Sequence, residues 1–281
     1  MKRLLFSALI SLAAFLPGKA QEVLRPVAAS YTLSAGSLKL NDTYLTPLDY
    51  TGSSYAFTYE RFQAMKFAPE KWIQTLRVSA GFGTTENPAR NATMMAIGTD
   101  FSWGMLRKWK IPQAEGLSLA AGGRAEGDIG ALYLSRNGNN PVAAKAAVTL
   151  APAGMAIYNF RIGRLPVTLT WTTSVPLVGA LFSQKYGELY YEIYLGNRSG
   201  LVSLATPANY FRFCNTVAAD LRTGGTFIRI GYHNDLTSTK VHDLTTNISS
   251  HSFVIGLSGE WLSLNPRKKL NPDAKTISAI Y

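Results

Sequence analysis

Apolar and polar residues alternate between Ser252 and Leu262. One face of this stretch carries Phe253, Ile255, Leu257, Gly259 and Trp261, and the other carries Ser252, Gly256, Ser258 and Glu260. A period of two is typical of an extended strand, because successive side chains of a strand point to opposite faces. Similar stretches recur along the chain. A sheet that is apolar on one face and polar on the other can lie in lipid when it closes into a barrel.

Ten period-two segments bounded by turn residues can be recognised, at residues 53–62, 71–83, 92–106, 117–135, 142–160, 166–178, 186–195, 209–221, 225–233 and 251–262. Most match the roughly 9 to 11 residues that a tilted strand needs to cross the hydrocarbon layer. A further strand at residues 27–40 and a break at Ala151–Gly154 would raise the count to twelve. The sequence therefore predicts an all-β fold, an antiparallel transmembrane β-barrel of about 10 to 12 strands.

The first 20 residues have the three parts of a cleavable signal peptide. Lys2 and Arg3 form the charged start, Leu4–Leu16 the apolar run, and Gly18–Ala20 the cleavage site. Four parts of the chain are predicted: a signal peptide at 1–20, an N-terminal segment at 21–52 with one possible strand, the barrel at 53–262, and a basic C-terminal tail at 263–281. The tail, with its Arg267–Lys269 run, is expected to be solvated.

Cleavage after residue 20 would leave 25 of the 28 basic residues against 17 acidic ones. An exported basic chain is expected to meet outer-membrane lipid and no nucleic acid. The single cysteine, Cys214, excludes an internal disulfide, and no cofactor is expected. The predicted location is the outer membrane, or the periplasm if the chain does not form a membrane barrel.

The predicted connections fall into two lengths. Residues 136–140 and 223–225 read as compact turns, whereas residues 196–208 and 234–250 read as longer polar loops. Outer-membrane barrels have short periplasmic turns and longer outer loops. Both compact turns are therefore expected at the same, periplasmic end.

Charged residues of both signs remain for the lumen when the apolar faces point outward. The predicted lumen-facing residues are Arg77, Asp100, Arg124, Glu126, Asp128, Lys145, Glu188, Glu192, Arg212, Asp220, Arg229 and Glu260. A barrel of this size is narrow and largely filled by side chains. A network of salt bridges is the favoured interpretation, and a small polar conduit is the alternative.

Three histidines, His233, His242 and His251, lie near Asp235 and Asp243. No metal site is expected, because no two of the histidines have the close spacing that favours zinc binding. No catalytic residue is assigned, although His233, His251 and Ser252 are weak candidates for a lipid hydrolase. His251 and Ser252 are neighbours and should point to opposite faces, whereas His233 could approach Ser252 across a hairpin.

Two stretches carry a family resemblance: Asn41–Gly52, and Gly231–Asp235 followed by His251–Gly256. They resemble a family of exported, barrel-like Bacteroidota proteins of unknown function, and the Ala20–Gln21 junction is similar to signal sites of that phylum. The resemblance implies an outer-membrane or cell-envelope location and carries no catalytic residues. The leading hypothesis is a non-enzymatic barrel with a structural, binding or narrow-transport role. The alternatives are a lipid-modifying barrel enzyme and a soluble periplasmic β-sandwich or lipocalin-like binding protein.

Overall fold

The computed structural model describes residues 23–138, 140–224, 227–262 and 274–281. The predicted signal peptide at 1–20 and the basic Arg267–Lys269 run lie outside these residues. No helix in the described part of the chain is long and apolar enough to cross a membrane.

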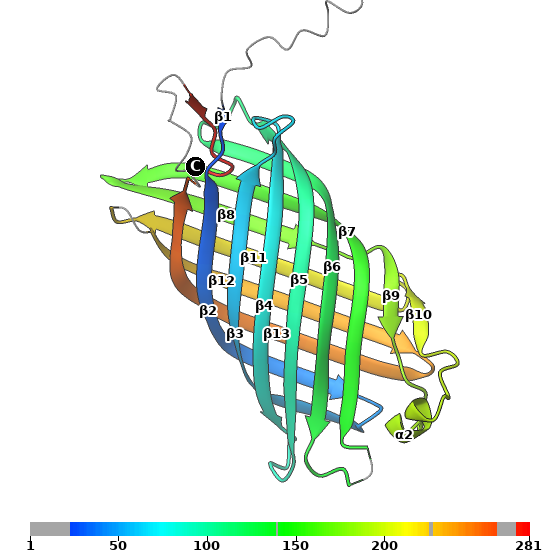
Figure 1. Ribbon diagram of the computed structural model, residues 1–281. Coiled ribbons are helices and arrows are strands. Elements are labelled where there is room, and N and C mark those ends of the chain that lie inside the picture. Colours follow the sequence, from blue (N-terminus) through cyan, green and yellow to red (C-terminus); the bar gives the residue numbers. More distant parts are fainter. Residues whose placement is uncertain (1–22, 139, 225–226, 263–273) are drawn as a thin grey trace, which may run out of the picture.

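Ten long antiparallel strands close into a single barrel (Figure 1). They are β2 (Val27–Asp42), β3 (Thr46–Ala64), β4 (Trp72–Glu86), β5 (Thr93–Lys110), β6 (Leu117–Leu134), β7 (Val142–Ile162), β8 (Leu165–Ser174), β11 (Tyr210–Arg222), β12 (Phe227–Val241) and β13 (Leu244–Trp261). Pairing of β13 with β2 and of β7 with β8 completes the ring. The predicted barrel is confirmed, with ten strands, and the sheet does not form a β-sandwich.

The two faces of the wall differ in polarity as the alternation predicts. On β13, Phe253, Ile255 and Leu257 are 60%, 52% and 56% exposed, whereas Ser252 and Ser258 are buried. Exposed apolar side chains recur on the outer face of the other barrel strands, including Ile97 on β5 and Ile129 on β6. The outer surface is therefore suited to lipid.

The two ends of the barrel carry different structures (Figure 1). At the terminal end, the short strands β1 (Val23–Leu24) and β14 (Lys275–Thr276) pair in parallel. The opposite end, called here the loop end, carries α2 (Tyr190–Tyr194) and the hairpin of β9 (Val178–Phe182) and β10 (Val202–Ala205). Strand β7 pairs first with β9 and then, beyond Pro152, with β8.

One predicted strand is wrong. Residues 186–195 form a loop and helix α2 instead of a strand. The position in the ring between β7 and β11 is already taken by β8, so the barrel closes without them. The tenth strand is β2, in the segment where the sequence left a strand open.

Two predictions about connections are also wrong, and the break considered at Ala151–Gly154 does not occur. Residues 234–250 are not a loop, because β12 and β13 continue to a two-residue turn at His242 and Asp243, whose φ angles are 53° and 61°. The two predicted compact turns lie at opposite ends of the barrel, because β6 meets β7 at the loop end whereas β11 meets β12 at the terminal end. Strand β7 runs unbroken through Pro152, so the count stays at ten.

Apolar side chains fill the lumen near both ends. At the terminal end the buried cluster includes Phe62, Ile73, Leu106, Ile157 and Ile280. At the loop end it includes Leu38, Leu40, Tyr50, Met94 and Leu132. The polar layers of the lumen therefore lie between two apolar layers.

The last residues of the chain fold back into the barrel. Ala279 and Ile280 are buried, and their carbonyl oxygens accept hydrogen bonds from Lys108 Nζ and Asn159 Nδ2, both at 2.9 Å. The Tyr281 ring packs edge-on against Phe227, with centroids 5.2 Å apart. Residues 274–281, called here the C-terminal plug, are thus not a solvated extension as the sequence predicted.

Candidate functional site

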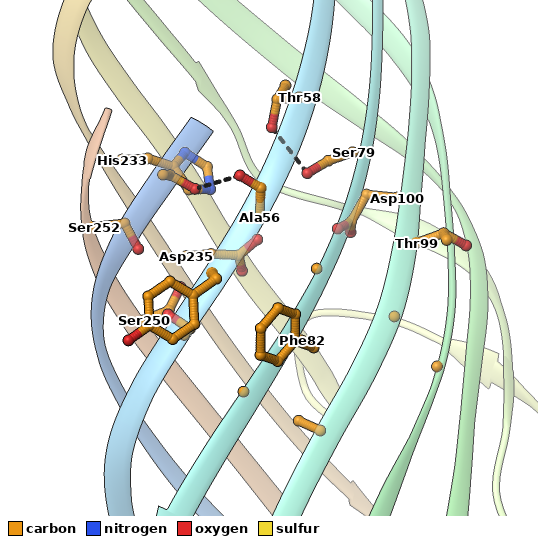
Figure 2. Close-up of a pocket in the computed structure, with 18 of the residues that line it drawn as sticks. Ala56, Thr58, Ser79, Phe82, Thr99, Asp100, His233, Asp235, Ser250 and Ser252 are labelled. Atoms are coloured by element: carbon orange, nitrogen blue, oxygen red, sulfur yellow. Dashed lines mark hydrogen bonds between the residues drawn. The ribbon is translucent and has the colours of Figure 1, made fainter. Parts of the chain in front are cut away.

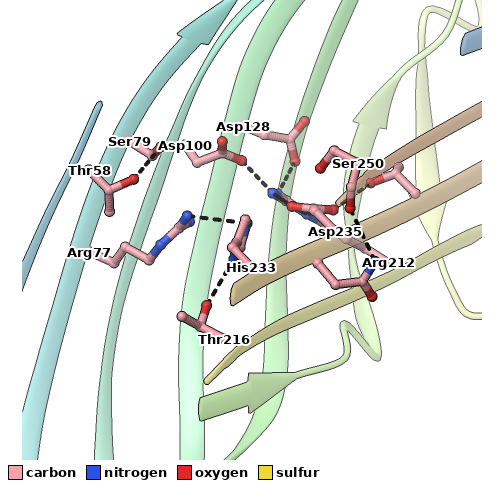
Figure 3. Close-up of polar contacts among 12 residues, drawn as sticks. Thr58, Arg77, Ser79, Asp100, Asp128, Arg212, Thr216, His233, Asp235 and Ser250 are labelled. Atoms are coloured by element: carbon pink, nitrogen blue, oxygen red, sulfur yellow. Dashed lines mark hydrogen bonds and ion pairs between the residues drawn. The ribbon is translucent and has the colours of Figure 1, made fainter. Parts of the chain in front are cut away.

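Arg212 on β11 lies at the centre of a cluster of charged side chains in the lumen (Figure 3). Its Nε donates to both carboxylate oxygens of Asp235 at 3.2 and 3.1 Å, and its Nη2 donates to Asp100 at 2.5 Å. Its Nη1 lies 3.5 Å from Asp128, which also accepts a hydrogen bond from Tyr210 OH at 3.0 Å. One guanidinium is therefore shared by three carboxylates, which come from three different strands.

The sheet register makes this arginine necessary. Asp100 and Asp128 lie directly opposite each other on β5 and β6. Like charges in this position repel, and burial strengthens the repulsion. Arg212, reaching across from β11, lies between them and offsets that repulsion.

A second charged cluster surrounds Arg229 on β12. Arg229 donates two hydrogen bonds to Asp220 at 2.7 and 2.9 Å and a third to Glu60 at 2.8 Å. Asp220 also accepts hydrogen bonds from Ser258 at 2.7 Å and from Tyr281 OH at 3.3 Å. This network connects the barrel wall to the C-terminal plug.

Arg77 differs from these two arginines. Among the described residues it forms no ion pair, and its hydrogen-bond partner is His233 Nε2 at 3.5 Å (Figure 3). Because Arg77 can only donate, Nε2 accepts, and the ring hydrogen on Nδ1 can be donated to Thr216 Oγ1 at 2.8 Å. Within the described chain Arg77 therefore faces the lumen as a cation without an ion pair, and Asp100 and Glu60 attract it from beyond ion-pair distance.

A cavity of about 240 Å³, called here the central chamber, lies beside these residues (Figure 2). Its polar lining includes Arg77, Asp100, Arg212, His233 and Ser252. The inward positions Ala56, Gly81, Gly98 and Gly130 lie in one register row across β3 to β6 and also line it. Outward side chains such as Phe82 and Ile97 also belong to the lining, so the cavity extends to the outer face of the wall at this row.

A smaller cavity of about 80 Å³ continues toward the loop end. It shares Asp128, Lys145 and Ile248 with the central chamber and extends to Tyr44 and Gln184. Lys145 forms an ion pair with Asp42 at 2.5 Å. The chamber is thus separated from the loop end by a few side chains.

The remaining predicted lumen residues have different surroundings. Arg124 and Glu126 are buried on β6, and Glu260 is half-buried with its Oε1 unpaired among the described residues. Glu188 is buried, but in the loop before α2. Glu192 is exposed on α2 and caps the amide of Leu189, so its predicted lumen position is wrong.

The hydrolase candidates do not form a catalytic group. His233 and Ser252 lie opposite each other on β12 and β13, and both line the chamber. In the part of the chain that the structure describes, no hydrogen bond joins them, and none joins His233 to a carboxylate. His251 points outward and contacts Tyr232 OH at 2.6 Å. A base-activated serine with an oriented histidine is therefore not assembled.

One group of side chains has metal-ligating atoms close together. One atom each of Cys214, His233 and Asp235 lies within 4.8 Å of the other two. However, Asp235 is bound to Arg212, and His233 lies between Thr216 and Arg77. The guanidinium groups of Arg212 and Arg77, which contact Asp235 and His233, disfavour the binding of a divalent cation. The absence of a metal stays a prediction.

Sequence reasoning missed several residues of these clusters. Asp42 and Glu60 were not recognised as ion-pair partners of Lys145 and Arg229. Asp235 was assigned to a loop. Its position two residues after His233 was the available signal, because residues two apart in a strand share a face.

The sequence matches one family model. That model, DUF3316, is described as a protein of unknown function, and it matches residues 3–268. The match confirms the resemblance to an uncharacterised family, whereas the Bacteroidota source stays a prediction. No curated protein matches the sequence.

Solved barrels are similar in shape at low identity. The transport unit of the autotransporter AIDA-I from Escherichia coli has 12% identity and a TM-score of 0.44, covering 92% of this chain and 97% of that chain. The outer membrane protease OmpT from Escherichia coli has 7% identity and a TM-score of 0.39, covering 84% and 96%. The β domain of the Bordetella autotransporter BrkA has 10% identity and a TM-score of 0.38, covering 83% and 100%. These scores are too low to transfer a function.

Proposed function

We propose that this chain, which belongs to DUF3316, a family of proteins of unknown function, is an outer-membrane β-barrel. It binds a small molecule in its lumen and does not act as an open pore or an enzyme. Outer-membrane lipid is its surrounding partner.

The membrane location rests on the polarity of the wall. Apolar residues are exposed on the outer face of the strands, while charged clusters around Arg212 and Arg229 lie inside. A soluble barrel such as a lipocalin places these polarities the other way round. The export signal predicted from the sequence supports the same location.

The closed lumen is the observation that carries the binding role. The apolar cluster with the C-terminal plug lies on one side of the central chamber, and the apolar cluster around Leu40 and Met94 lies on the other. Small barrels are filled by side chains, whereas open channels need about 16 to 18 strands. A chamber that lies between two apolar layers suits a ligand that is bound and retained.

Membrane insertion is tested by reconstitution. The refolded protein should float with lipid vesicles and migrate differently on a gel before and after boiling, because a closed barrel resists detergent when cold. Recovery in the soluble fraction without detergent would contradict the membrane location.

Conductance separates a binding barrel from a pore. In planar bilayers the wild-type protein should show no steady ion conductance, because the lumen is filled by side chains near both ends. A stable ohmic conductance would contradict the closed lumen while leaving the membrane location intact. Release of fatty acid from vesicle lipid, lost in Ser252→Ala, would instead support the enzyme alternative.

A further inference from the structure

We infer that the central chamber binds a small amphipathic monoanion, with its anionic head on Arg77 and its apolar body beside the row of small residues on β3 to β6. This inference deepens the proposed binding function and rests on it. The head is a carboxylate or another group of single negative charge.

The ion pairs of the arginines in the chamber show which of them can bind the anionic head of a ligand. Arg212 and Arg229 are each held by two or more carboxylates, so they have little left to offer a ligand. Arg77 lines the same chamber, but in the described structure its contact is the weak 3.5 Å bond to His233. A guanidinium without an ion pair in a confined site favours an anion, through short charge-assisted hydrogen bonds.

Carboxylates in the chamber limit the ligand to one negative charge. The lining of the chamber holds four cations, Arg77, Lys145, Arg212 and Arg229, and four carboxylates, Glu60, Asp100, Asp128 and Asp235, so it has no surplus of positive charge. A dianion would be repelled by the carboxylates. A monoanion can place its single charge against Arg77. Its uncharged remainder is then not repelled by the carboxylates.

The row of small residues provides space for the apolar body. Gly81, Gly98 and Gly130 are adjacent across three strands, so no side chain fills the lumen in front of them. A Cβ added to Gly98 would have its nearest contact at 3.4 Å, which is ordinary packing. The volume of about 240 Å³ lies near the lower end of the range of small-molecule sites, about 300 to 1,000 Å³. The ligand is therefore about the size of a six-carbon acid.

The inference is tested with hexanoate as the probe, by calorimetric titration of the barrel in lipid nanodiscs. Hexanoate should bind saturably at one site per barrel. Hexanol and hexylamine, which have the same apolar length, should bind at least 10-fold more weakly because they lack the anionic head. Arg77→Gln should weaken hexanoate binding by roughly 10- to 100-fold, the usual range for losing a charge-assisted pair.

Matched variants separate the site from the fold. Arg61→Gln removes the same charge from the outer face of β3 and should leave the affinity unchanged. Gly98→Leu should abolish binding by filling the chamber, whereas Gly123→Leu on the outer face of β6 should not. If Gly98→Leu does not fold, Gly98→Ala should still reduce the affinity.

Two results would overturn the inference. One is equal binding of hexanoate, hexanol and hexylamine by a barrel that passes the heat-shift test. The other is unchanged hexanoate affinity in Arg77→Gln. Either result leaves the proposed membrane barrel standing, whereas failure of the heat-shift and flotation tests would remove the proposed function itself.

Discussion

Replacing Arg212 with leucine is expected to lower the free energy of unfolding by about 3 to 5 kcal/mol, the cost of leaving buried charges without their partner. Asp100, Asp128 and Asp235 would then face one another in the lumen with no guanidinium between them. The free energy is measured by denaturant titration in lipid vesicles, followed by tryptophan fluorescence.

Two controls identify the cause of this loss. Arg61→Leu removes an arginine from the outer face and should change the free energy of unfolding by less than about 0.5 kcal/mol. Adding Asp100→Asn and Asp235→Asn to Arg212→Leu should recover most of the lost stability, because two of the stranded charges are removed. If the triple variant is no more stable than Arg212→Leu, the loss comes from packing and the electrostatic explanation is wrong.

Substituting Ile280 with aspartate is expected to release the C-terminal plug from the barrel. Ile280 is 3% exposed within the terminal-end apolar cluster, and a carboxylate there would have no partner. Burying such a group costs several kcal/mol, so the plug should undock instead. Amide hydrogen exchange of residues 277–281 should then accelerate by about 100-fold or more, as expected for a local opening of low free energy.

The matched control is Thr276→Asp, which places the same charge on an exposed residue of the plug. Its hydrogen exchange should stay within a few-fold of wild type. The exposed ion pair of Lys275 with Glu70, which lowers the pKa of Glu70, should also survive in this control. Unchanged protection in Ile280→Asp would show that the plug is held by its polar contacts to Lys108, Asn159 and Asp220 alone.

The barrel could be predicted from the alternation, and the ten strands lie within the predicted range of 10 to 12, but one predicted strand falls in the wrong segment. Residues 186–195 alternate well and are rich in tyrosine, yet β8 fills the position in the ring between β7 and β11, which is a property of the whole sheet. In β2 the apolar residues change faces: Tyr31 and Leu33 are exposed, whereas Leu38 and Leu40 are buried in the lumen. This change obscures a period of two.

The sequence also predicts a loop at the polar ends of β12 and β13, residues 234–250, because the period of two is lost there. These strands have 15 and 18 residues, more than the roughly 9 to 11 that cross the hydrocarbon layer. Beyond that layer both faces meet water, so the alternation disappears. The positions of Asp100, Asp128 and Arg212 followed from alternation, but their meeting depends on barrel closure and shear, which local patterns do not encode.

The seam between β2 and β13 has a consequence for folding kinetics. It pairs residues at opposite ends of the barrel sequence, and the hydrogen bond from Thr246 to Asp42 spans 204 residues. Closing so long a loop costs more chain entropy than forming the hairpins between consecutive strands. We therefore expect the seam to form late. The C-terminal plug contacts β5, β7 and β11, and these contacts require the finished ring. Docking of residues 274–281 should therefore slow the opening of the seam and keep the barrel closed.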